Sequence, residues 1–414
     1  MESKYFYSST EVVSSGHPDR LADNCAAALI DRIQKKDGPN SHAAVEVAIA
    51  NDKLIFSGEV TTSLDITQSL LREVAEEAYT KSGYIPAFRK YFTKSQCALL
   101  DDMEIYNFIH SQSPDIALGT TDQGVDSGFN DQGVFYSTSD NTTPNHVGIL
   151  HQIAHEICRA LQGEALNSVL VRKDPTRVLG VDNKTIVTGK FSSDAYTLLE
   201  ITAITIAVAH SEETPTENVR EIVLSVIDPI LHKYHFTMSS EDILINGTGR
   251  FVVHGSVGDS SCQGRKLSVN TPSAGPIYMY KNLGGGSKIK PWHASDFLLD
   301  VYSRFIANVI VASNLSDYAL VGTSCAIGQK NLQSISIIGD KKFNEFTNYD
   351  KIVSFFSQDV TPKYLANLFG LFSDNFSFLE CVDYNFYGYP SKHPWDNPTL
   401  IDEWSHKLID YLKL

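Results

Sequence analysis

Apolar side chains recur at helical spacing in several stretches of the chain. After Pro18, the apolar positions that share one helical face are Leu21, Cys25, Leu29 and Ile33. This spacing predicts an amphipathic helix that starts at Pro18, which suits the first helical position, and ends at Gly38. The same periodicity predicts helices near residues 64–81, 146–161, 217–234, 295–312 and 400–412.

Shorter apolar stretches between these helices predict β-strands. Residues 42–50 and 53–61 are strand-like and are joined at Asn51-Asp52, which is typical of a tight hairpin. Two long polar stretches, 115–143 and 247–286, are rich in glycine, and long loops of this kind are usually functional or mobile. Further strands are expected near residues 168–172, 185–189, 198–209, 319–327 and 334–338.

Strand pairs therefore alternate with helices along the chain. The pattern predicts an α/β protein of the α+β type, built from about three units of mixed β-sheet with helices on one face. A length of 414 residues also exceeds what one typical core accommodates. A doubly wound parallel sheet would require a long array of uniformly apolar strands, which the sequence lacks.

The composition argues against several classes of protein. The net charge is −15, whereas a nucleic-acid-binding protein usually has a basic surface, so we expect no nucleic-acid partner. No stretch reaches the roughly 18 apolar residues of a membrane span, and the N-terminus lacks an apolar signal-peptide core. The six cysteines are scattered without a CxxC pair, which favours reduced thiols in a cytoplasmic protein.

A first candidate site lies at the start of the first predicted helix, in Gly16-His17-Pro18-Asp19. Exposed N–H groups at a helix N-terminus favour anions, and His17 could hold a phosphate oxygen. Asp19 offers the hard oxygen ligands that Mg²⁺ prefers. Alternatively, Asp19 simply caps the helix and His17 packs against it.

Three further segments could bind ligands, and each has a plain structural alternative. In the segment NDQG, Asp131 could bind an amino group, or the segment could simply be a turn. Arg265 and Lys266 are adjacent cations after a glycine, which suits a polyphosphate but also a solvated basic turn. The glycine run 284–286 before Lys290 could close as a flap over phosphates, or be an exposed loop.

His151 and His155 stand at the spacing of a zinc site on a predicted helix. No third ligand is evident in the sequence, so a structural role is favoured. The chain also lacks a GxSxG motif, and no cysteine has an activating setting, so we expect no enzyme nucleophile.

Taken in order, these segments resemble the S-adenosylmethionine synthetase (methionine adenosyltransferase) family over nearly the whole chain. Each matching stretch is short, but their joint order and spacing is highly specific. The stretches are Glu11 with GHPD at 16–19, SGEVTT at 57–62, QSPDI at 112–116, DQG at 131–133, HSEE at 210–213, INGTGRF at 245–251, GD at 258–259 and GRK at 264–266.

The resemblance implies a fold and a reaction. The fold has three similar α/β subdomains that exchange segments, here expected at residues 1–118, 119–249 and 250–414. Two subunits pair through their sheets, so a homodimer or tetramer with active sites at the subunit interface is implied. In the reaction, the methionine sulfur attacks C5′ of ATP, and the released triphosphate is cleaved to pyrophosphate and phosphate. The implied cofactors are two Mg²⁺ ions and K⁺.

The resemblance also implies roles for individual residues. The catalytic group would be His17, Arg265, Lys266 and Lys290. The residues that bind ATP would be Glu11, Asp174, Phe251, Arg265 and Lys266. The residues that face the amino acid would be Glu59, Gln112, Ile116 and Asp131. The metal ligands would be Asp19 and Asp296 for magnesium, and Glu46 and Asp259 for potassium.

Several positions depart from the family pattern. The family's catalytic lysine corresponds to Thr176, although Arg177 could partly substitute. The second flap lysine, which helps to hold the methionine and phosphate end, corresponds to Ala294. Arg20 replaces the lysine that follows GHPD, and the family's GAGDQG loop reads GFNDQG at residues 128–133.

Three interpretations stay open on the sequence alone. The chain could be a working synthetase with an altered flap. It could be a paralogue that binds ATP and magnesium but uses a different amino acid, as the change at Ala294 suggests. It could also be a non-catalytic partner that modulates an authentic synthetase, because Thr176 replaces the catalytic lysine.

Overall fold

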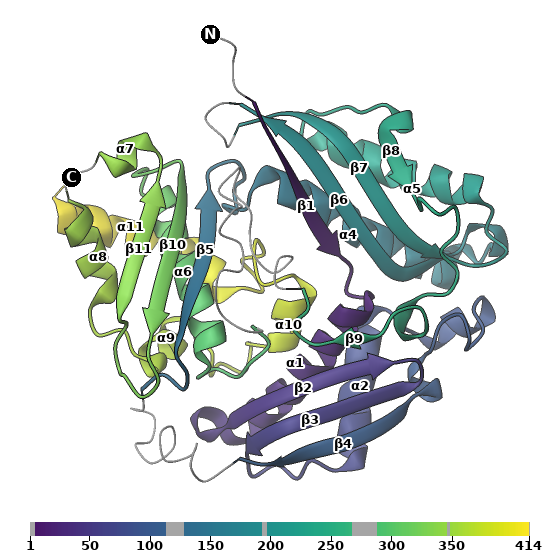
Figure 1. Cartoon of the computed structure of the whole chain (residues 1–414), viewed down its shortest axis with the longest axis horizontal. Coiled ribbons are helices and arrows are strands. Elements are labelled where there is room, and N and C mark those ends of the chain that lie inside the picture. Colours follow the sequence, from purple (N-terminus) through teal and green to yellow (C-terminus); the bar gives the residue numbers. More distant parts are fainter. Residues whose placement is uncertain (1–4, 113–127, 193–196, 267–287, 346–347, 414) are drawn as a thin grey trace.

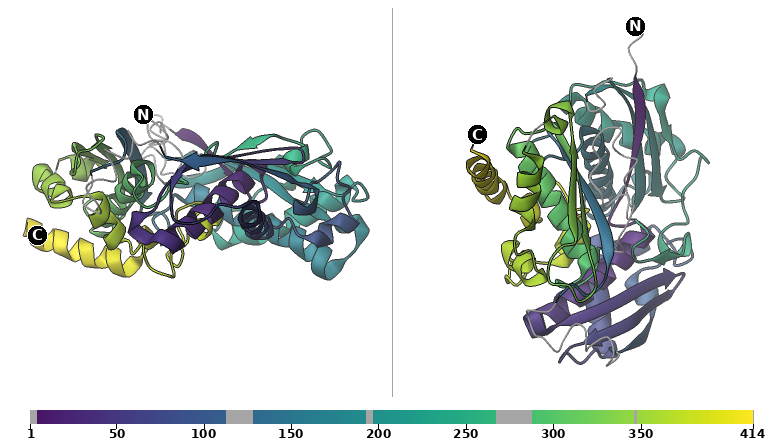
Figure 2. Two further views of the ribbon diagram at one scale, coloured as in Figure 1. Left: turned by 90° about the horizontal axis from the view of Figure 1, so that it is seen from below. Right: turned by 60° about the vertical axis from the view of Figure 1, so that its left-hand side comes forward.

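The computed structural model describes residues 5–112, 128–192, 197–266, 288–345 and 348–413, and these residues form three β-sheets. The sheets face the viewer in Figure 1, and most helices lie behind them. The edge-on view in Figure 2 places the strands toward one side of the molecule and the helices toward the other. The predicted α/β class, with helices on one face of the sheets, is therefore confirmed.

The first sheet has the strand order β4-β3-β2-β9. β2 and β3 form the predicted hairpin with the expected bounds, and β4 joins β3 in parallel. Two helices cover one face of this sheet, and their bounds are α1 (Pro18–Asp37) and α2 (Gln68–Ser82). The strands are β2 (His42–Ala50), β3 (Lys53–Thr61), β4 (Glu104–Ser111) and β9 (Ser261–Cys262).

The second sheet has the order β1-β6-β7-β8, with β8 parallel to β7 and the other pairs antiparallel. One face packs against α4, which contacts β1, β6 and β7. The strands are β1 (Phe6–Val13), β6 (Leu179–Phe191), β7 (Leu198–His210) and β8 (Ile243–Ile245). The helices of this unit are α4 (Ile149–Asn167) and α5 (Thr216–Lys233).

The third sheet has the order β11-β10-β5 and is antiparallel throughout. The long helix α6 packs on it with the bounds that the sequence predicts, Ser295–Ala312. The strands are β5 (Gly133–Asp140), β10 (Tyr318–Cys325) and β11 (Ser334–Gly339). The remaining helices are α7 (Lys341–Asn344), α8 (Tyr349–Ser357), α9 (Pro362–Leu368), α10 (Phe378–Asp383) and α11 (Pro398–Leu412). Within the described ranges, no helix is both long and apolar enough to cross a membrane.

The strand predicted at residues 168–172 is wrong. These residues form a π-helical turn that continues α4 and ends at Lys173, whose φ is +56°. A short apolar run does not by itself distinguish a strand from a helical turn. The helix predicted from residue 64 instead begins at Gln68, because the hydroxyl of Thr67 caps it by accepting the N–H of Leu70 at 3.2 Å.

Each sheet contains a strand from a distant part of the chain. β1 pairs with β6 in the second sheet, β5 pairs with β10 in the third, and β9 pairs with β2 in the first. The start of α1 therefore lies where β9 and β6 come close to it. The predicted subdomain limits at residues 118 and 249 stay predictions.

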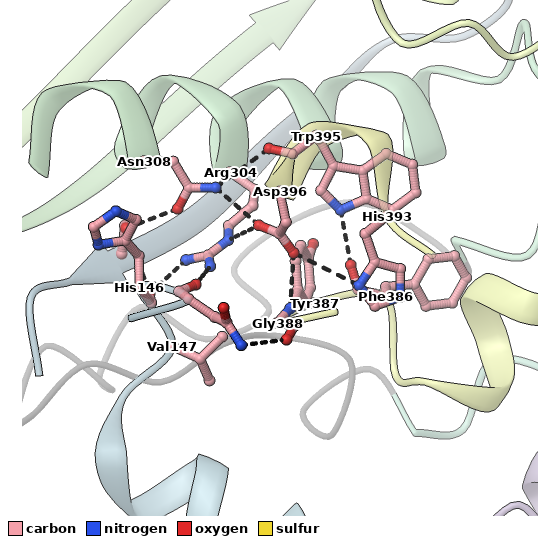
Figure 3. Close-up of polar contacts among 12 residues, drawn as sticks. His146, Val147, Arg304, Asn308, Phe386, Tyr387, Gly388, His393, Trp395 and Asp396 are labelled. Atoms are coloured by element: carbon pink, nitrogen blue, oxygen red, sulfur yellow. Dashed lines mark hydrogen bonds and ion pairs between the residues drawn. The ribbon is translucent and has the colours of Figure 1, made fainter. Parts of the chain in front are cut away.

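A buried ion pair fastens the C-terminal segment to the third sheet (Figure 3). Arg304 of α6 is fully buried and donates to Asp396 at 2.9 Å and to the carbonyl oxygens of Thr138 and His146 at 2.7 and 2.8 Å. Burial raises the pKa of Asp396, but the charge of Arg304 and the hydrogen bond with His393 outweigh it and lower this pKa to about 2. The pair thus joins α6, β5 and the segment before α11.

We expect Arg304→Met to lower the free energy of unfolding by about 3–5 kcal/mol, because it leaves the buried carboxylate of Asp396 without its counter-charge. The matched control is Lys407→Met on α11, whose surface pair with Glu403 should contribute about 0.5 kcal/mol or less. Urea unfolding of both variants measures the difference. Equal shifts of the unfolding midpoint in the two variants would show that the buried pair contributes no more to stability than the surface pair.

Candidate functional site

His17 and Gly16 fix the start of α1. The His17 backbone is extended, with φ −64° and ψ 138°, and its Nδ1 accepts the backbone N–H of Asp19 at 3.2 Å. Gly16 lies so close to β6 that a Cβ atom there would approach the carbonyl oxygen of Val181 to 2.5 Å. The imidazole of His17, rather than the carboxylate of Asp19, therefore caps this helix.

The same contact fixes the position of the proton on the His17 ring. Because a backbone N–H donates to Nδ1, the neutral ring carries its proton on Nε2. Burial, assisted by the ammonium of Lys266, lowers the pKa of His17 to about 3. The side chain is therefore a neutral hydrogen-bond donor at neutral pH, which suits an anionic oxygen.

The carboxylate of Asp19 holds the segment after β9 against α1. Lys266 Nζ lies 2.5 Å from one oxygen of Asp19, and Arg265 Nη1 lies 3.7 Å from the other. The backbone N–H of Cys262 also donates to Asp19, at 3.2 Å. Asp19 is 1% exposed, so these groups balance a charge that water hardly reaches. His17, Asp19, Arg265 and Lys266 are thus brought together as predicted.

Asp23 lies one helical turn further along α1 and is fully buried. It accepts the N–H of Gly264 at 2.8 Å and pairs with Arg20 at 3.2 Å. Burial raises the pKa of Asp23 to about 6, although the charge of Arg20 opposes the rise. Arg20 also donates a hydrogen bond to the buried side chain of Asn385, so its guanidinium is engaged by residues of the core.

A hollow of about 130 Å³ opens beside His17, between the loop 251–259 and the sheet formed by β6 and β7. We call it the β6–β7 hollow. Phe251 and Asp259, two predicted ligand-contacting residues, share it with His17. Its lining is completed by Pro18, Asp182, Lys184, Ala207, His254 and Gly258.

Sequence reasoning missed Asp182, Lys184 and His254. The strand predicted here starts at residue 185, whereas β6 begins at Leu179 and includes Asp182 and Lys184. Side chains two apart on a strand share a face, so the alternation over residues 182–184 was the available signal. His254 stands in a glycine-rich loop and gives no comparable signal.

A second group of predicted site residues lies at the start of α6. Lys290 Nζ lies 3.5 Å from Glu46 of β2. The hydroxyl of Ser295, the first residue of α6, donates to the carbonyl oxygen of Asp131 at 3.1 Å. Asp296 follows in the first turn of the helix. A hydrogen bond from the side chain of Gln263 to the carbonyl oxygen of Ile289, at 3.0 Å, links the segment that carries Lys290 to the segment that carries Arg265 and Lys266.

Other predicted ATP-binding residues lie on the second unit. Glu11 of β1 pairs with Lys184 at 3.5 Å, and both side chains are 36% exposed. Asp174 precedes β6, and its carboxylate accepts both the N–H and the hydroxyl of Thr176, at 2.9 and 2.8 Å. Asp174 therefore shapes its own turn, and its predicted contact with ATP stays a prediction.

The residues predicted to face the amino acid are only partly described. Glu59 is half-buried on β3, directly after Gly58, whose φ of +116° favours glycine. Gln112 follows β4 and donates its N–H to the carbonyl of Val60 at 3.0 Å. Ile116 and the glycine run 284–286 lie outside the described residues.

The two histidines at zinc-like spacing have contacts of a structural kind. His155 Nδ1 lies 2.7 Å from the hydroxyl of Tyr389, and His151 Nδ1 lies 3.3 Å from that of Thr10. Both rings are buried along α4. These contacts support the structural interpretation.

Comparisons with known proteins agree with the resemblance. The chain matches the family models for the S-adenosylmethionine synthetase N-terminal domain over residues 4–114 and for its central domain over residues 126–251. It is 30% identical over 407 residues to the S-adenosylmethionine synthase of Fusobacterium nucleatum, which covers 97% of this chain and 98% of that protein. The S-adenosylmethionine synthase of Acholeplasma laidlawii is 31% identical over 373 residues, covering 89% of this chain and 90% of that protein.

The fold also matches a solved structure. An unusual S-adenosylmethionine synthetase from Campylobacter jejuni superposes with a TM-score of 0.83 at 26% sequence identity, covering 97% of this chain and 100% of that one. The predicted fold family is therefore confirmed.

We expect NMR of ¹⁵N-histidine-labelled protein to show His17 as the neutral Nε2–H form from neutral pH down to about pH 4. His254 is the internal contrast: its Nδ1 lies 3.0 Å from the carbonyl of Val252, so it should be the Nδ1–H form. Because burial lowers the pKa of His17 from 6.5 to about 3, its contribution to stability is present above 6.5 and falls as the pH drops through this window. A His17 signal that titrates near pH 6.5 would contradict the geometry.

Proposed function

Because the chain belongs to the S-adenosylmethionine synthetase family, we propose that it transfers the adenosyl group of ATP to the sulfur of methionine. The product is S-adenosylmethionine, and the released triphosphate is cleaved to pyrophosphate and phosphate. The observation that carries this proposal is the group formed by His17, Asp19 and Lys266 beside the β6–β7 hollow. It combines a neutral N–H donor, a lysine cation and a helix N-terminus, which suits a polyphosphate.

Among the described residues no cluster of three or more His, Cys, Asp or Glu side chains could hold a metal by itself. One or two carboxylates together with the phosphates of a bound nucleotide are nevertheless a usual ligand set for Mg²⁺, and Asp19 fits that role. Asp19 is a buried carboxylate, and in this conformation Lys266 and Arg265 balance its charge, so Mg²⁺ would replace these cations at its oxygens while they move to the phosphates. In the proposed site Asp19 and Asp296 would hold Mg²⁺, and Glu46 and Asp259 would lie near K⁺. Bound Mg²⁺ supplies neutralisation of the triphosphate charge.

The chain's own residues would act by positioning and by electrostatics. The Nε2–H of His17 would donate to the oxygen that gains charge as the bond to C5′ breaks. Lys266, Arg265 and Lys290 would hold the triphosphate, and Phe251 would face the adenosine. Sulfur is itself the nucleophile, so no proton transfer from the protein is required in this step.

The altered positions predict a slow enzyme. Thr176 is engaged with Asp174, and Arg177 pairs with Glu221 at 3.0 and 3.2 Å, so in this conformation it does not replace the missing lysine. Ala294 is buried at the N-cap of α6. Each lost cation would cost about 3 kcal/mol of transition-state stabilisation, or about a hundredfold in rate.

Uncovered sheet faces support assembly with a second copy. Phe108, Leu244 and Ile338 lie on faces that the helices do not cover, and they are 62%, 54% and 45% exposed. Exposed apolar patches on sheets mark interaction surfaces. We therefore include a homodimer or tetramer, with sites between subunits, in the proposal.

We expect purified protein given ATP, Mg²⁺, K⁺ and methionine to form S-adenosylmethionine and phosphate, detected by mass spectrometry. Asp19→Ala should abolish this activity, and Asp402→Ala on the exposed face of α11 is the matched control. Triphosphate cleavage without the product would favour a different amino-acid acceptor, as the change at Ala294 suggests. Absence of both ATP binding and product would favour the non-catalytic partner. An active Asp19→Ala protein would refute the metal assignment.

We expect Thr176→Lys to raise kcat by about ten- to a hundredfold, because it restores a cation at an exposed position that accommodates a longer side chain. Thr399→Lys at the start of α11 is the matched control, and it should leave kcat unchanged. The measurement is the initial rate of product formation at saturating substrates. An unchanged rate in Thr176→Lys would show that this position no longer limits the reaction.

A further inference from the structure

A buried cation lies two residues before Lys290 and is not among the residues of the proposed site. Lys288 is 4% exposed, and its ammonium lies 2.6 Å from a carboxylate oxygen of Asp300 on α6. It also donates to the hydroxyl of Tyr387 at 2.7 Å, and that hydroxyl donates to Asp300. We call Lys288, Asp300 and Tyr387 the buried triad. Two oxygens from different segments thus fix the position of the Lys288 ammonium.

The residues after Lys288 connect the buried triad to the proposed phosphate-binding group. The carbonyl oxygen of Ile289 accepts the side-chain N–H of Gln263 at 3.0 Å, and the backbone N–H of Gln263 donates to the backbone of β2 at 2.9 Å. Lys290 then reaches Glu46 of β2 at 3.5 Å. The backbone just before Lys290 is therefore held at two successive residues, one by its side chain and one by its carbonyl.

A strained turn between α10 and α11 places Tyr387 (Figure 3). Asn385 and Phe386 have φ angles of +58° and +63°, a region that asparagine tolerates and phenylalanine rarely adopts. Such a conformation persists only where the surroundings enforce it. Here the indole N–H of Trp395 donates to the carbonyl oxygen of Phe386 at 2.8 Å, and the side chain of Asn385 accepts from Arg20 of α1. The turn therefore ties the buried triad to α1, the helix that carries the proposed site.

Stability alone gives little reason for a buried triad. Burial lowers the pKa of Lys288 and raises that of Asp300, and the attraction between the two charges opposes both shifts. An apolar pair of similar size often stabilises a core as well as a buried ion pair does, or better. What an apolar pair lacks is direction, because an ammonium must point its N–H groups at acceptors. The benefit of the triad therefore lies in the geometry that it imposes on the adjoining chain.

We infer that the buried triad positions Lys290, so that this lysine meets the same bound triphosphate as Arg265 and Lys266. This inference rests on the proposed function. Each member of the triad is a positioning residue, because it acts through Lys290 and touches no substrate. A backbone that is held before the ligand arrives need not be ordered on binding, so the triad strengthens the binding of a triphosphate.

The decisive variant is Lys288→Met/Asp300→Leu, which removes both charges at once and leaves no unpaired carboxylate in the core. Its midpoint of urea unfolding should stay close to that of the unmodified protein. By calorimetry with Mg²⁺ present, its affinity for inorganic tripolyphosphate should fall about tenfold, as it should in Lys290→Met. When Lys290→Met is already present, the same double change should alter the affinity less than about twofold, because the triad acts through that lysine.

A smaller change tests the triad without altering any charge. Tyr387→Phe removes one hydroxyl at nearly constant size, and we expect the affinity for tripolyphosphate to fall about threefold. Tyr302→Phe on α6 is the matched control, because its hydroxyl is also buried and donates to the carbonyl oxygen of Phe356 at 2.6 Å. It should shift the unfolding midpoint by a similar amount and leave the affinity unchanged.

Three results would overturn the inference. They are full affinity in Lys288→Met/Asp300→Leu, losses that multiply when this change is combined with Lys290→Met, and equal losses of affinity in the two tyrosine variants. A failure of the proposed function is a different result, because the unmodified protein would then bind neither ATP nor tripolyphosphate.

Discussion

Buried charge at the start of α1 is the constraint on which the candidate site depends. Asp19 and Asp23 project into space that water hardly reaches, where an unpaired carboxylate is strongly unfavourable. The partners of these carboxylates come from β9 and the segment after it, namely the backbone N–H groups of Cys262 and Gly264 and the ammonium of Lys266. The same contacts hold β9 and the segment after it against the start of α1, so packing and the proposed ligand chemistry share one origin.

In the proposed reaction the methionine sulfur is the nucleophile, so the protein's part is to recognise and hold the triphosphate. Lys266 and Arg265 already balance a carboxylate, and His17 is held as a neutral donor by the backbone of its own helix. Such groups recognise an anion through geometry that exists before binding. The departures at Thr176 and Ala294 lie outside this arrangement, so under the proposed function they would bear on the rate and on the acceptor rather than on nucleotide recognition.

The sequence predicted those features that depend on local pattern. The hairpin of β2 and β3 and the helix α6 have the expected bounds, because alternation and helical spacing are strong there. The grouping of His17, Asp19 and Lys266 followed from family motifs, which carry long-range information. The turn at 168–172 and the place of Asp182 in the β6–β7 hollow were missed because both depend on tertiary surroundings. The turn depends on the continuation of α4, and the hollow depends on the loop whose Gly255 N–H donates to Asp182.

The exchange of strands has a consequence during synthesis on the ribosome. β1 is made early, yet its partner residues run from Lys184 to Phe191. At ~5–20 residues per second, translation leaves this strand without its neighbour for roughly 10 to 40 s. A strand edge that stays unpaired for this long can pair with other nascent chains. Production of this protein should therefore depend on chaperone capacity more than the stability of the finished fold suggests.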